Sequence, residues 1–227
     1  RKPDKVLKLK KTLYGFKQSP RSFWKYLTKA MEACGMTVSK LDPCLFVGDK
    51  VLCICYVDDI LFWAKDEADI IELGIKLCAQ GLLLEQEDDA AGFLGFCLTK
   101  NDAGLIKMKQ TGLINRVIET LGLDQKMSTL KATTAESTPL VRDEEGEPPH
   151  GDFGYSSVVG MLLYLSGHTR PDISYAINCC ARYMFNPRHS HEIALKQINR
   201  YLKATRDCGL VLNPCKNLKV DCYPDSD

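Results

Sequence analysis

The stretch Val51–Lys65, "VLCICYVDDILFWAK", places two adjacent carboxylates, Asp58 and Asp59, inside the most apolar segment of the chain. The flanking residues are rich in β-branched, aromatic and other apolar side chains, which favour β-strands. We therefore predict two strands, Val51–Val57 and Ile60–Ala64, that form a hairpin with the acids at or beside its turn. Because adjacent residues of a strand point to opposite faces, both carboxylates share one site only near such a bend.

Two explanations fit this acidic hairpin. An ionised carboxylate beside a core is costly unless it is paired or bound to a metal, and Mg²⁺ is typically held by one or two carboxylates plus substrate phosphates. A pair of such ions supports phosphoryl transfer by activating the attacking oxygen and stabilising the leaving one. The alternative is a surface hairpin whose turn is simply acidic, since Asp is a common turn residue. Taken alone, the Asp-Asp pair favours this second explanation.

Composition narrows the class of protein. No segment offers the roughly 20 mostly apolar residues that a membrane helix needs, and the N-terminal "RKPDKVLKLKK" lacks the apolar region of a signal peptide. We therefore expect a soluble, intracellular chain, whose 227 residues suffice for one large domain or two small ones. The 11 cysteines include no C-x-x-C pair, so buried free thiols are a better interpretation than a zinc site.

The net charge of +1 is unevenly distributed along the chain. Residues 1–29 hold ten Lys or Arg and one acid, residues 66–102 hold nine acids and two Lys, and residues 182–206 hold six Lys or Arg and one acid. Two basic blocks on either side of an acidic one would suit contact with a phosphate backbone. The alternative is that these charges cover solvated helix faces, and charge alone does not separate the two.

Apolar periodicity and turn residues predict the order of the elements. A helix begins with Ser19 as N-cap and Pro20 at the first position, and it ends at Gly35. The further predicted elements are a strand at Leu45–Val47, a helix over 66–81, a hairpin of Gly92–Thr99 with Leu105–Met108, a helix over Gln110–Leu123, helices over Tyr155–Thr205 with breaks near Pro171 and Pro187, and strands at Leu210–Leu212 and Leu218–Cys222. Residues 126–152 are rich in Thr, Pro and charge, which indicates a flexible linker.

Several motifs follow one another in a fixed order over nearly the whole chain. They are "LKKTLYGFKQSPRSFW" (Leu9–Trp24), "YVDD" (Tyr56–Asp59), "FLGF" (Phe93–Phe96), "YSSVVGMLLYLSGHTRPDISYAIN" (Tyr155–Asn178), "ALKQINRYLKAT" (Ala194–Thr205) and "DCYPDSD" (Asp221–Asp227). This ordered set resembles the reverse transcriptase region of copia-type LTR retrotransposon Pol polyproteins. The resemblance implies an RNA-directed DNA polymerase that extends a primer by Mg²⁺-dependent nucleotidyl transfer.

The resemblance also implies roles for single residues. Asp58 and Asp59 would be the catalytic carboxylates and the ligands of two Mg²⁺ ions, with Mn²⁺ as an alternative ion. The nucleotide-binding residues would be Tyr14, Gly15, Lys17, Gln18 and Tyr56, the last of these near the primer end. The primer grip would be formed by Phe93, Leu94 and Gly95. A core aromatic is the alternative for Tyr14, and an ordinary core strand is the alternative for the primer grip. Asp225 matches the first catalytic Asp of an RNase H domain, whose site would be incomplete here.

Two departures from the family's pattern limit the expected activity. The family's first catalytic Asp lies on an earlier strand, and the one acid before Leu13, Asp4, stands in a lysine-rich context that does not match. We therefore expect the fingers and the first palm strand to be missing, and the 227-residue chain to be inactive alone. Glu85 and Gln86 lie near the position where many relatives have a Lys, which leaves the source of a general acid open.

The expected fold class is α+β: a partial reverse-transcriptase palm, with an antiparallel sheet and helices on one face, followed by a thumb-like helix and a helical connection segment. The expected boundaries are 1–125 for the palm and thumb-like segment, 126–152 for the linker, 153–207 for the connection and 208–227 for the start of an RNase H-like domain. The implied partners are an RNA template, a DNA or tRNA primer, dNTPs and the remaining parts of a Pol polyprotein, with no membrane. The alternative function is a decayed or repurposed retroelement remnant that at most binds nucleic acid.

Overall fold

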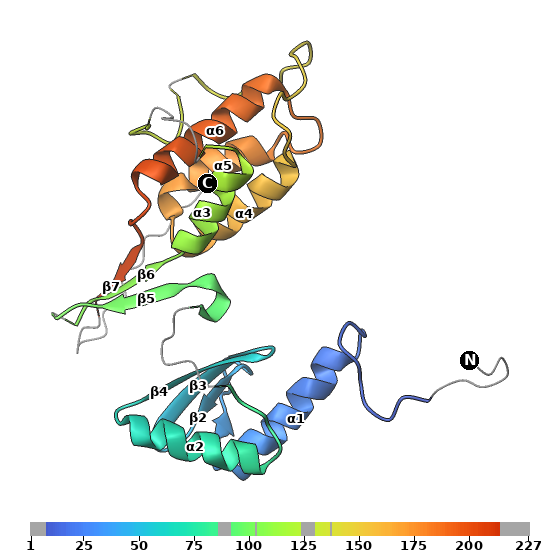
Figure 1. Ribbon diagram of the computed structural model, residues 1–227, viewed down its shortest axis with the longest axis vertical. Coiled ribbons are helices and arrows are strands. Elements are labelled where there is room, and N and C mark those ends of the chain that lie inside the picture. The colour runs from blue at the N-terminus through green and yellow to red at the C-terminus, as the bar shows by residue number, and fades with distance from the viewer. Residues whose placement is uncertain (1–7, 86–91, 103, 124–129, 137, 214–227) are drawn as a thin grey trace. The chain divides into compact units, whose positions relative to one another are not determined.

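The computed structural model describes residues 8–85, 92–102, 104–123, 130–136 and 138–213 (Figure 1). The chain divides into two compact units, Arg1–Leu94 and Gly95–Asp227. Both units combine helices with antiparallel strands, which confirms the α+β class. No helix within the described ranges is long and apolar enough to span a membrane.

Where its residues are described, the first unit is an antiparallel sheet with two helices. Its strands are β1 (Thr37–Val38), β2 (Leu45–Val47), β3 (Val51–Tyr56) and β4 (Asp59–Ala64), in the spatial order β1-β2-β3-β4. Helix α1 (Ser19–Ala33) precedes the sheet and helix α2 (Glu67–Ala79) follows it. Buried residues of both helices form one apolar core with every second residue of β3, so α1 and α2 cover the same face of the sheet (Figure 1).

Helix α1 forms because its apolar residues repeat at helical spacing. Its buried positions are Leu27, Ala30 and Met31. Gly35, with a φ of +85°, follows the helix and ends it. The prediction of Ser19 as N-cap is wrong, because the helix begins at Ser19 itself, behind Gln18. The Ser19 hydroxyl donates to the carbonyl oxygen of Leu13 at 2.5 Å. This hydroxyl is therefore bonded to the turn before the helix and does not cap the helix N–H groups.

Strand β3 alternates between the two faces of its sheet. Val51, Cys53 and Cys55 are buried against the helices, whereas Leu52 and Tyr56 are exposed on the other face. A hydrogen bond with the Cys53 thiol, together with burial, raises the pKa of the Cys55 thiol. The prediction of buried free thiols is therefore confirmed for this pair.

In its described residues, the second unit combines a small sheet with four helices. Strands β5 (Cys97–Lys100), β6 (Ile106–Lys109) and β7 (Leu210–Leu212) are antiparallel in the order β5-β6-β7. The helices are α3 (Thr111–Thr120), α4 (Tyr155–His168), α5 (Ser174–Ala181) and α6 (His189–Ala204), with a short 3₁₀ turn, η2 (Pro171–Ile173), before α5. Apolar residues from all four helices make one core.

Two of the expected domain boundaries differ from this arrangement. Helix α3 belongs to the second unit rather than to a domain of residues 1–125, because its buried side, with Ile114 and Val117, joins the core of α4, α5 and α6. Strand β7 pairs with β6, with Leu210 opposite Met108. The described part of residues 208–227 therefore completes this sheet, and the start of an RNase H-like domain stays a prediction.

The predicted β5–β6 hairpin is present but shorter than expected. Strand β5 begins at Cys97 rather than at Gly92, because Phe93–Gly95 form a 3₁₀ turn, η1. Within it Leu94 and Gly95 have positive φ values of 53° and 74°, which a strand does not accommodate. The predicted strand Leu218–Cys222 lies outside the described residues.

A buried arginine joins the break between α4 and α5 to the end of α6. Arg170 is 1% exposed, and its guanidinium donates to both carboxylate oxygens of Asp172 and to the carbonyl and hydroxyl oxygens of Thr205 at 2.7–3.3 Å. The Tyr201 hydroxyl donates to the same carboxylate at 2.7 Å. Burial works to raise the pKa of Asp172, but the hydrogen bonds from Arg170 and Tyr201 outweigh it and lower this pKa. The "TRPD" motif is therefore a clamp on the C-terminal end of α6.

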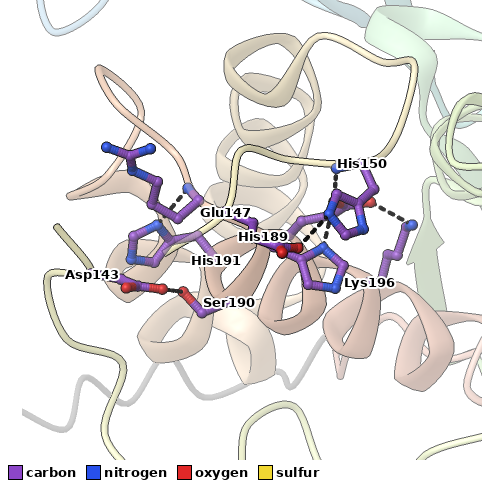
Figure 2. Close-up of polar contacts among 9 residues, drawn as sticks. Asp143, Glu147, His150, His189, Ser190, His191 and Lys196 are labelled. Carbon is purple, nitrogen blue, oxygen red and sulfur yellow. Dashed lines mark hydrogen bonds and ion pairs between the residues drawn. The ribbon is translucent and has the colours of Figure 1, made fainter. Parts of the chain in front are cut away.

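The residues expected as a linker are fixed to α6 over their described C-terminal part, 138–152, which forms no helix or strand. The Val141 carbonyl accepts from His191 Nε2 at 3.0 Å. The Asp143 carboxylate accepts from the Ser190 hydroxyl at 2.7 Å (Figure 2). These contacts join residues 50 and 47 positions apart. The segment is therefore packed on the helix rather than a free tether, and we call it the α6 strap.

A buried carboxylate organises the same contact. Glu192 is 0% exposed and accepts from Lys196 Nζ at 2.6 Å, from the His150 backbone N–H at 2.6 Å and from His189 Nδ1 at 3.1 Å. The rings of His150 and His189 stack with centroids 3.9 Å apart (Figure 2). Burial alone would raise the pKa of Glu192, but these three donors outweigh it and lower the pKa to about 2. Glu192 is thus a charged anchor for the strap.

Candidate functional site

The turn between β3 and β4 carries the two carboxylates that the sequence singled out. Tyr56 pairs directly with Asp59 across the hairpin, so Val57 and Asp58 are its two turn residues. Val57 has a φ of +57°. A positive φ at the first central residue alone is the pattern of a type II′ turn, in which glycine is the usual residue. A β-branched residue in this conformation is strained, and such strain concentrates at functional sites.

The hairpin places its carboxylates at the tip and on the uncovered face of the sheet. Residues paired directly across an antiparallel ladder lie on the same face, so Asp59 lies on the face of Tyr56, away from α1 and α2. Asp58 lies at the tip, and both Asp side chains are exposed. The acids therefore avoid the desolvation cost that their apolar neighbours suggested.

Asp58 and Asp59 suit the coordination chemistry of Mg²⁺ but do not complete a site by themselves. Mg²⁺ takes oxygen ligands and usually keeps water and substrate phosphates beside one or two carboxylates. Two exposed, adjacent carboxylates at a turn fit this requirement. Within the described residues, no group of three or more His, Cys, Asp or Glu side chains is placed to hold a metal ion. A divalent ion here would need further ligands from a nucleotide or from another segment.

The residues expected to bind a nucleotide lie in the turn before α1. Tyr14 is 97% exposed, which excludes the alternative that it is a core aromatic. Gly15 has a φ of +89°, and a Cβ there would meet no atom within 4 Å, so its backbone is open to close approach. Lys17 and Gln18 are exposed as well. No hydrogen bond among the described residues joins this turn to the β3–β4 hairpin, so a pocket shared with Asp58 stays a prediction.

The expected primer grip, Phe93–Gly95, forms the η1 turn and is half-buried except for its exposed glycine. The alternative of an ordinary core strand is therefore wrong, whereas the role as primer grip stays a prediction. The unit boundary falls inside this turn, after Leu94. Glu85 is exposed, and Gln86 and Asp225 lie outside the described residues.

Three of the six basic residues between Arg182 and Arg206 donate hydrogen bonds to other parts of the protein. Arg188 donates to the Glu144 carbonyl at 3.2 Å, Lys196 donates to Glu192 at 2.6 Å, and Lys203 donates to the Leu123 carbonyl at 2.6 Å. The sequence allowed this block to follow a phosphate backbone. The sequence did not reveal these internal partners. Glu144 lies 44 positions from Arg188, and Leu123 lies 80 positions from Lys203, so no local pattern connects them.

Comparison with known proteins identifies the family. The family profile described as "Reverse transcriptase (RNA-dependent DNA polymerase)" matches residues 1–135. The chain is 31% identical over 230 residues to the retrovirus-related Pol polyprotein from transposon RE2 of Arabidopsis thaliana, covering 100% of this chain and 16% of that protein. It is 30% identical over 220 residues to the Pol polyprotein from transposon TNT 1-94 of Nicotiana tabacum, covering 91% and 16%. It is also 32% identical over 179 residues to an uncharacterised mitochondrial protein of Arabidopsis thaliana, covering 77% and 70%. No solved structure matches the chain.

This chain belongs to the reverse transcriptase family. Its sequence is similar to a segment of the Pol polyproteins of copia-type retrotransposons, which confirms the resemblance seen in "YVDD" and its neighbouring motifs. The chain spans about 16% of the length of the Pol polyproteins that it matches.

Proposed function

We propose that this chain is part of an RNA-directed DNA polymerase that extends a primer by nucleotidyl transfer on an RNA template. The observation that carries the proposal is the pair of exposed carboxylates at the tip of a two-residue turn, in a chain of the reverse transcriptase family. Phosphoryl transfer relies on positioning and charge stabilisation rather than on covalent chemistry of the protein. Two acids on a turn fixed by strands on both sides suit that task.

The proposed roles follow from where each residue lies. When bound by Asp58 and Asp59, Mg²⁺ supplies activation of the primer hydroxyl and stabilisation of the leaving oxygen. Tyr56 lies on the face of Asp59 and would pack beside the primer end. Gly15 would let a nucleotide approach the backbone closely, and the exposed Lys17 would contact its phosphates. Gln18 and Tyr14 would complete the same surface.

The outer edge of β4 is where a further strand would complete the site. In the described part of the chain β4 is the last strand of its sheet, and Asp59 is its first residue. A strand that brings a third carboxylate would pair along this edge, close to Asp59. The family's pattern places that acid before "LYG", where Asp4 does not match it. We therefore propose that the 227 residues alone do not extend a primer.

The substrates and partners follow from the same proposal. They are an RNA template, a DNA or tRNA primer, dNTPs and the remaining parts of a Pol polyprotein, since the relatives named above carry this segment within such polyproteins. A cytoplasmic particle and the nucleus are the locations that the family implies.

Primer extension with Mg²⁺ on an RNA template tests the proposal. The assay compares the 227-residue chain with a fusion that adds the segment preceding the aligned region of the RE2 polyprotein. We expect extension by the fusion and none by the chain alone. In the fusion, Asp58→Asn should lower the rate on the order of a hundredfold or more, because charge stabilisation in the transition state is lost. The matched control Asp49→Asn, an exposed acid between β2 and β3, should leave the rate unchanged.

Three results would contradict the assignment. Extension by the chain alone would show that no third carboxylate is required. Equal rates for Asp58→Asn and Asp49→Asn would show that the hairpin does not hold the metal. A fusion that binds nucleic acid and never extends a primer would favour the repurposed remnant instead.

A further inference from the structure

Residues 8–33 carry an unbalanced positive charge on their surface. They contain seven Lys or Arg and one acid, Glu32. The seven are Lys8, Lys10, Lys11, Lys17, Arg21, Lys25 and Lys29, and all are exposed. None of them forms an ion pair with another residue in the described ranges. Positive charge gathered on one part of the surface is the electrostatic footprint of a polyanion partner.

Three of these residues form a line along α1, which we call the α1 basic row: Arg21, Lys25 and Lys29. Residues four apart lie one above another on a helix, roughly 6 Å apart along its axis. The buried side of α1 faces the opposite direction. The row therefore points away from the protein core. Glu32 lies on the same side of the helix without forming an ion pair with it.

Helix α6 does not offer a comparable surface. Its basic residues Lys196 and Lys203 donate to a buried carboxylate and to a backbone carbonyl, and Arg188 before it donates to another carbonyl. Of the two basic blocks that the sequence presents, the one on α1 therefore keeps more of its charge available to a ligand.

The α1 basic row lies on a different side of the first unit from the candidate polymerase hairpin. Helix α1 packs on the sheet face that is lined by Cys53 and Phe46. Asp59 and Tyr56 lie on the opposite face. Because the row is on the side of α1 that faces away from the sheet, the sheet and the helix separate it from Asp59. A ligand of the row is therefore not the primer end itself.

We propose that the α1 basic row binds the phosphate backbone of single-stranded nucleic acid, as a second surface beside the β3–β4 hairpin. The choice of nucleic acid as partner rests on the proposed function. Trp24 is 39% exposed and lies three residues after Arg21, at the side of the row, and the exposed Phe16 precedes the helix. Aromatic side chains next to a basic track favour single strands, whose bases are free to stack.

An anionic membrane is the other polyanion that a basic row attracts. A helix that lies in a membrane surface buries an apolar face in the lipid. The apolar face of α1 is already buried against the sheet and α2. The row therefore fits a phosphate backbone better than a lipid surface.

The test measures binding of the full 227-residue chain to a fluorescent single-stranded RNA over a range of salt concentrations. The row variant replaces Arg21, Lys25 and Lys29 with Gln. It should weaken binding on the order of tenfold at low salt and reduce the slope of log Kobs against log salt by about 2, since each phosphate contact on a single strand contributes about 0.7. A charge-conserving variant, Arg21→Lys with Lys25→Arg and Lys29→Arg, should bind like the natural chain. Far-UV circular dichroism verifies that each variant is folded.

The matched control removes the same charge from the second unit, through Arg116→Gln, Arg142→Gln and Arg206→Gln at exposed positions. It should keep the salt slope. Equal losses in the control and in the row variant would overturn the proposal, as would tighter binding to duplex RNA or to phosphatidylserine vesicles than to the single strand. Failure of the polymerase proposal can be told apart from failure of this one. Primer extension tests the polymerase proposal, whereas the RNA-binding comparison between the variants tests the α1 basic row.

Discussion

Val57 is the residue at which the β3–β4 hairpin departs most from ordinary strand geometry, with a φ of +57° between two strands in regular register. Holding a β-branched residue there costs about 1–3 kcal/mol. The conformation persists because the ladder from Val51 and Ala64 to Tyr56 and Asp59 fixes both ends of the turn. The strained turn thus lowers the stability of the hairpin and holds the two carboxylates in a defined position.

Removing this strain should stabilise the first unit. We expect Val57→Gly to raise its free energy of unfolding by about 1 kcal/mol, because glycine adopts positive φ freely and loses only part of that gain to its larger unfolded-state entropy. Urea unfolding followed by tryptophan fluorescence reports on this unit, since both tryptophans, Trp24 and Trp63, lie in it. Val47→Gly, at a comparably exposed position in β2, is the control and should lower the stability. Similar losses in both variants would show that the turn is unstrained.

The sequence predicted the hairpin and the position of its acids, since apolar runs interrupted by Asp-Asp leave few alternatives. It did not predict the φ of Val57, because valine carries no preference for a left-handed turn. It also left Tyr14 open between core and surface, since an aromatic residue among lysines fits either environment. The exposure of Tyr14 depends on what packs beside it, which no local pattern encodes.

Helix α6 is held by two sets of polar contacts with other parts of the chain. Arg170 contacts its C-terminal end, and the α6 strap contacts Glu192. Both place a buried charge among several hydrogen-bonding partners, which makes a buried charge tolerable. The "TRPD" motif and the strap therefore serve the same end, the fixed position of one helix. Neither uses a residue of the candidate polymerase hairpin.

The strap predicts a pH dependence of stability. The pKa of Glu192 in the folded chain, about 2, is lower than the value of about 4.3 for a free Glu. The carboxylate therefore contributes stability that is fully present above about pH 4.3 and is lost as the pH falls toward 2. We expect Glu192→Gln to lower the free energy of unfolding of the second unit by on the order of 2 kcal/mol at pH 7, and to make its decline between about pH 5 and 2 shallower.

Circular dichroism during urea unfolding across this pH range measures both effects. Glu144→Gln, which changes an exposed carboxylate of the same strap, is the matched control and should alter neither. Parallel declines in the natural chain and in Glu192→Gln would show that Glu192 is not the anchor.

At the level of elements the sequence predicted most helices and strands, because apolar residues at helical or alternating spacing mark a buried face. The sequence predicted a linker where the strap lies, because only the composition of that segment, and no apolar periodicity, was available for the prediction. Thr, Pro and charged residues favour irregular structure, and the strap is irregular. Its attachment depends on single hydrogen bonds to residues more than 40 positions away, such as those to Ser190 and His191, which spacing does not reveal.

In the whole molecule the two units have separate cores. One described core draws on residues from Leu27 to Leu82 and the other on residues from Ile114 to Leu202. The order of the family's motifs along the chain was readable from the sequence, whereas the division after Leu94 was not. The expected boundary after residue 125 followed the change in composition and separated α3 from the core in which it is buried.

Each unit should therefore fold alone. Residues 1–94 and 95–227, produced separately, should each show a cooperative thermal transition within about 5 °C of the corresponding transition in the intact chain, a difference that corresponds to about 1 kcal/mol. Differential scanning calorimetry measures this. A fragment of residues 126–227 is the control, since it lacks the buried Ile114, Val117 and Ile118 and should be strongly destabilised. A fragment 95–227 no more stable than this control would contradict the division.

The register of the β3–β4 hairpin has an evolutionary consequence. Side chains alternate between faces with a period of two, so a one-residue slip of β4 along β3 would move Asp59 to the face that α1 and α2 cover. Substitutions at the turn change the backbone strain there, but the paired strands on both sides still hold the turn in place. A change of turn length either slips the register, which inverts the whole strand, or enlarges the loop, which moves Asp58 from its place beside Asp59. As a lineage of such sequences diverges, the number of residues between Tyr56 and Asp59 is therefore under stronger constraint than their identity.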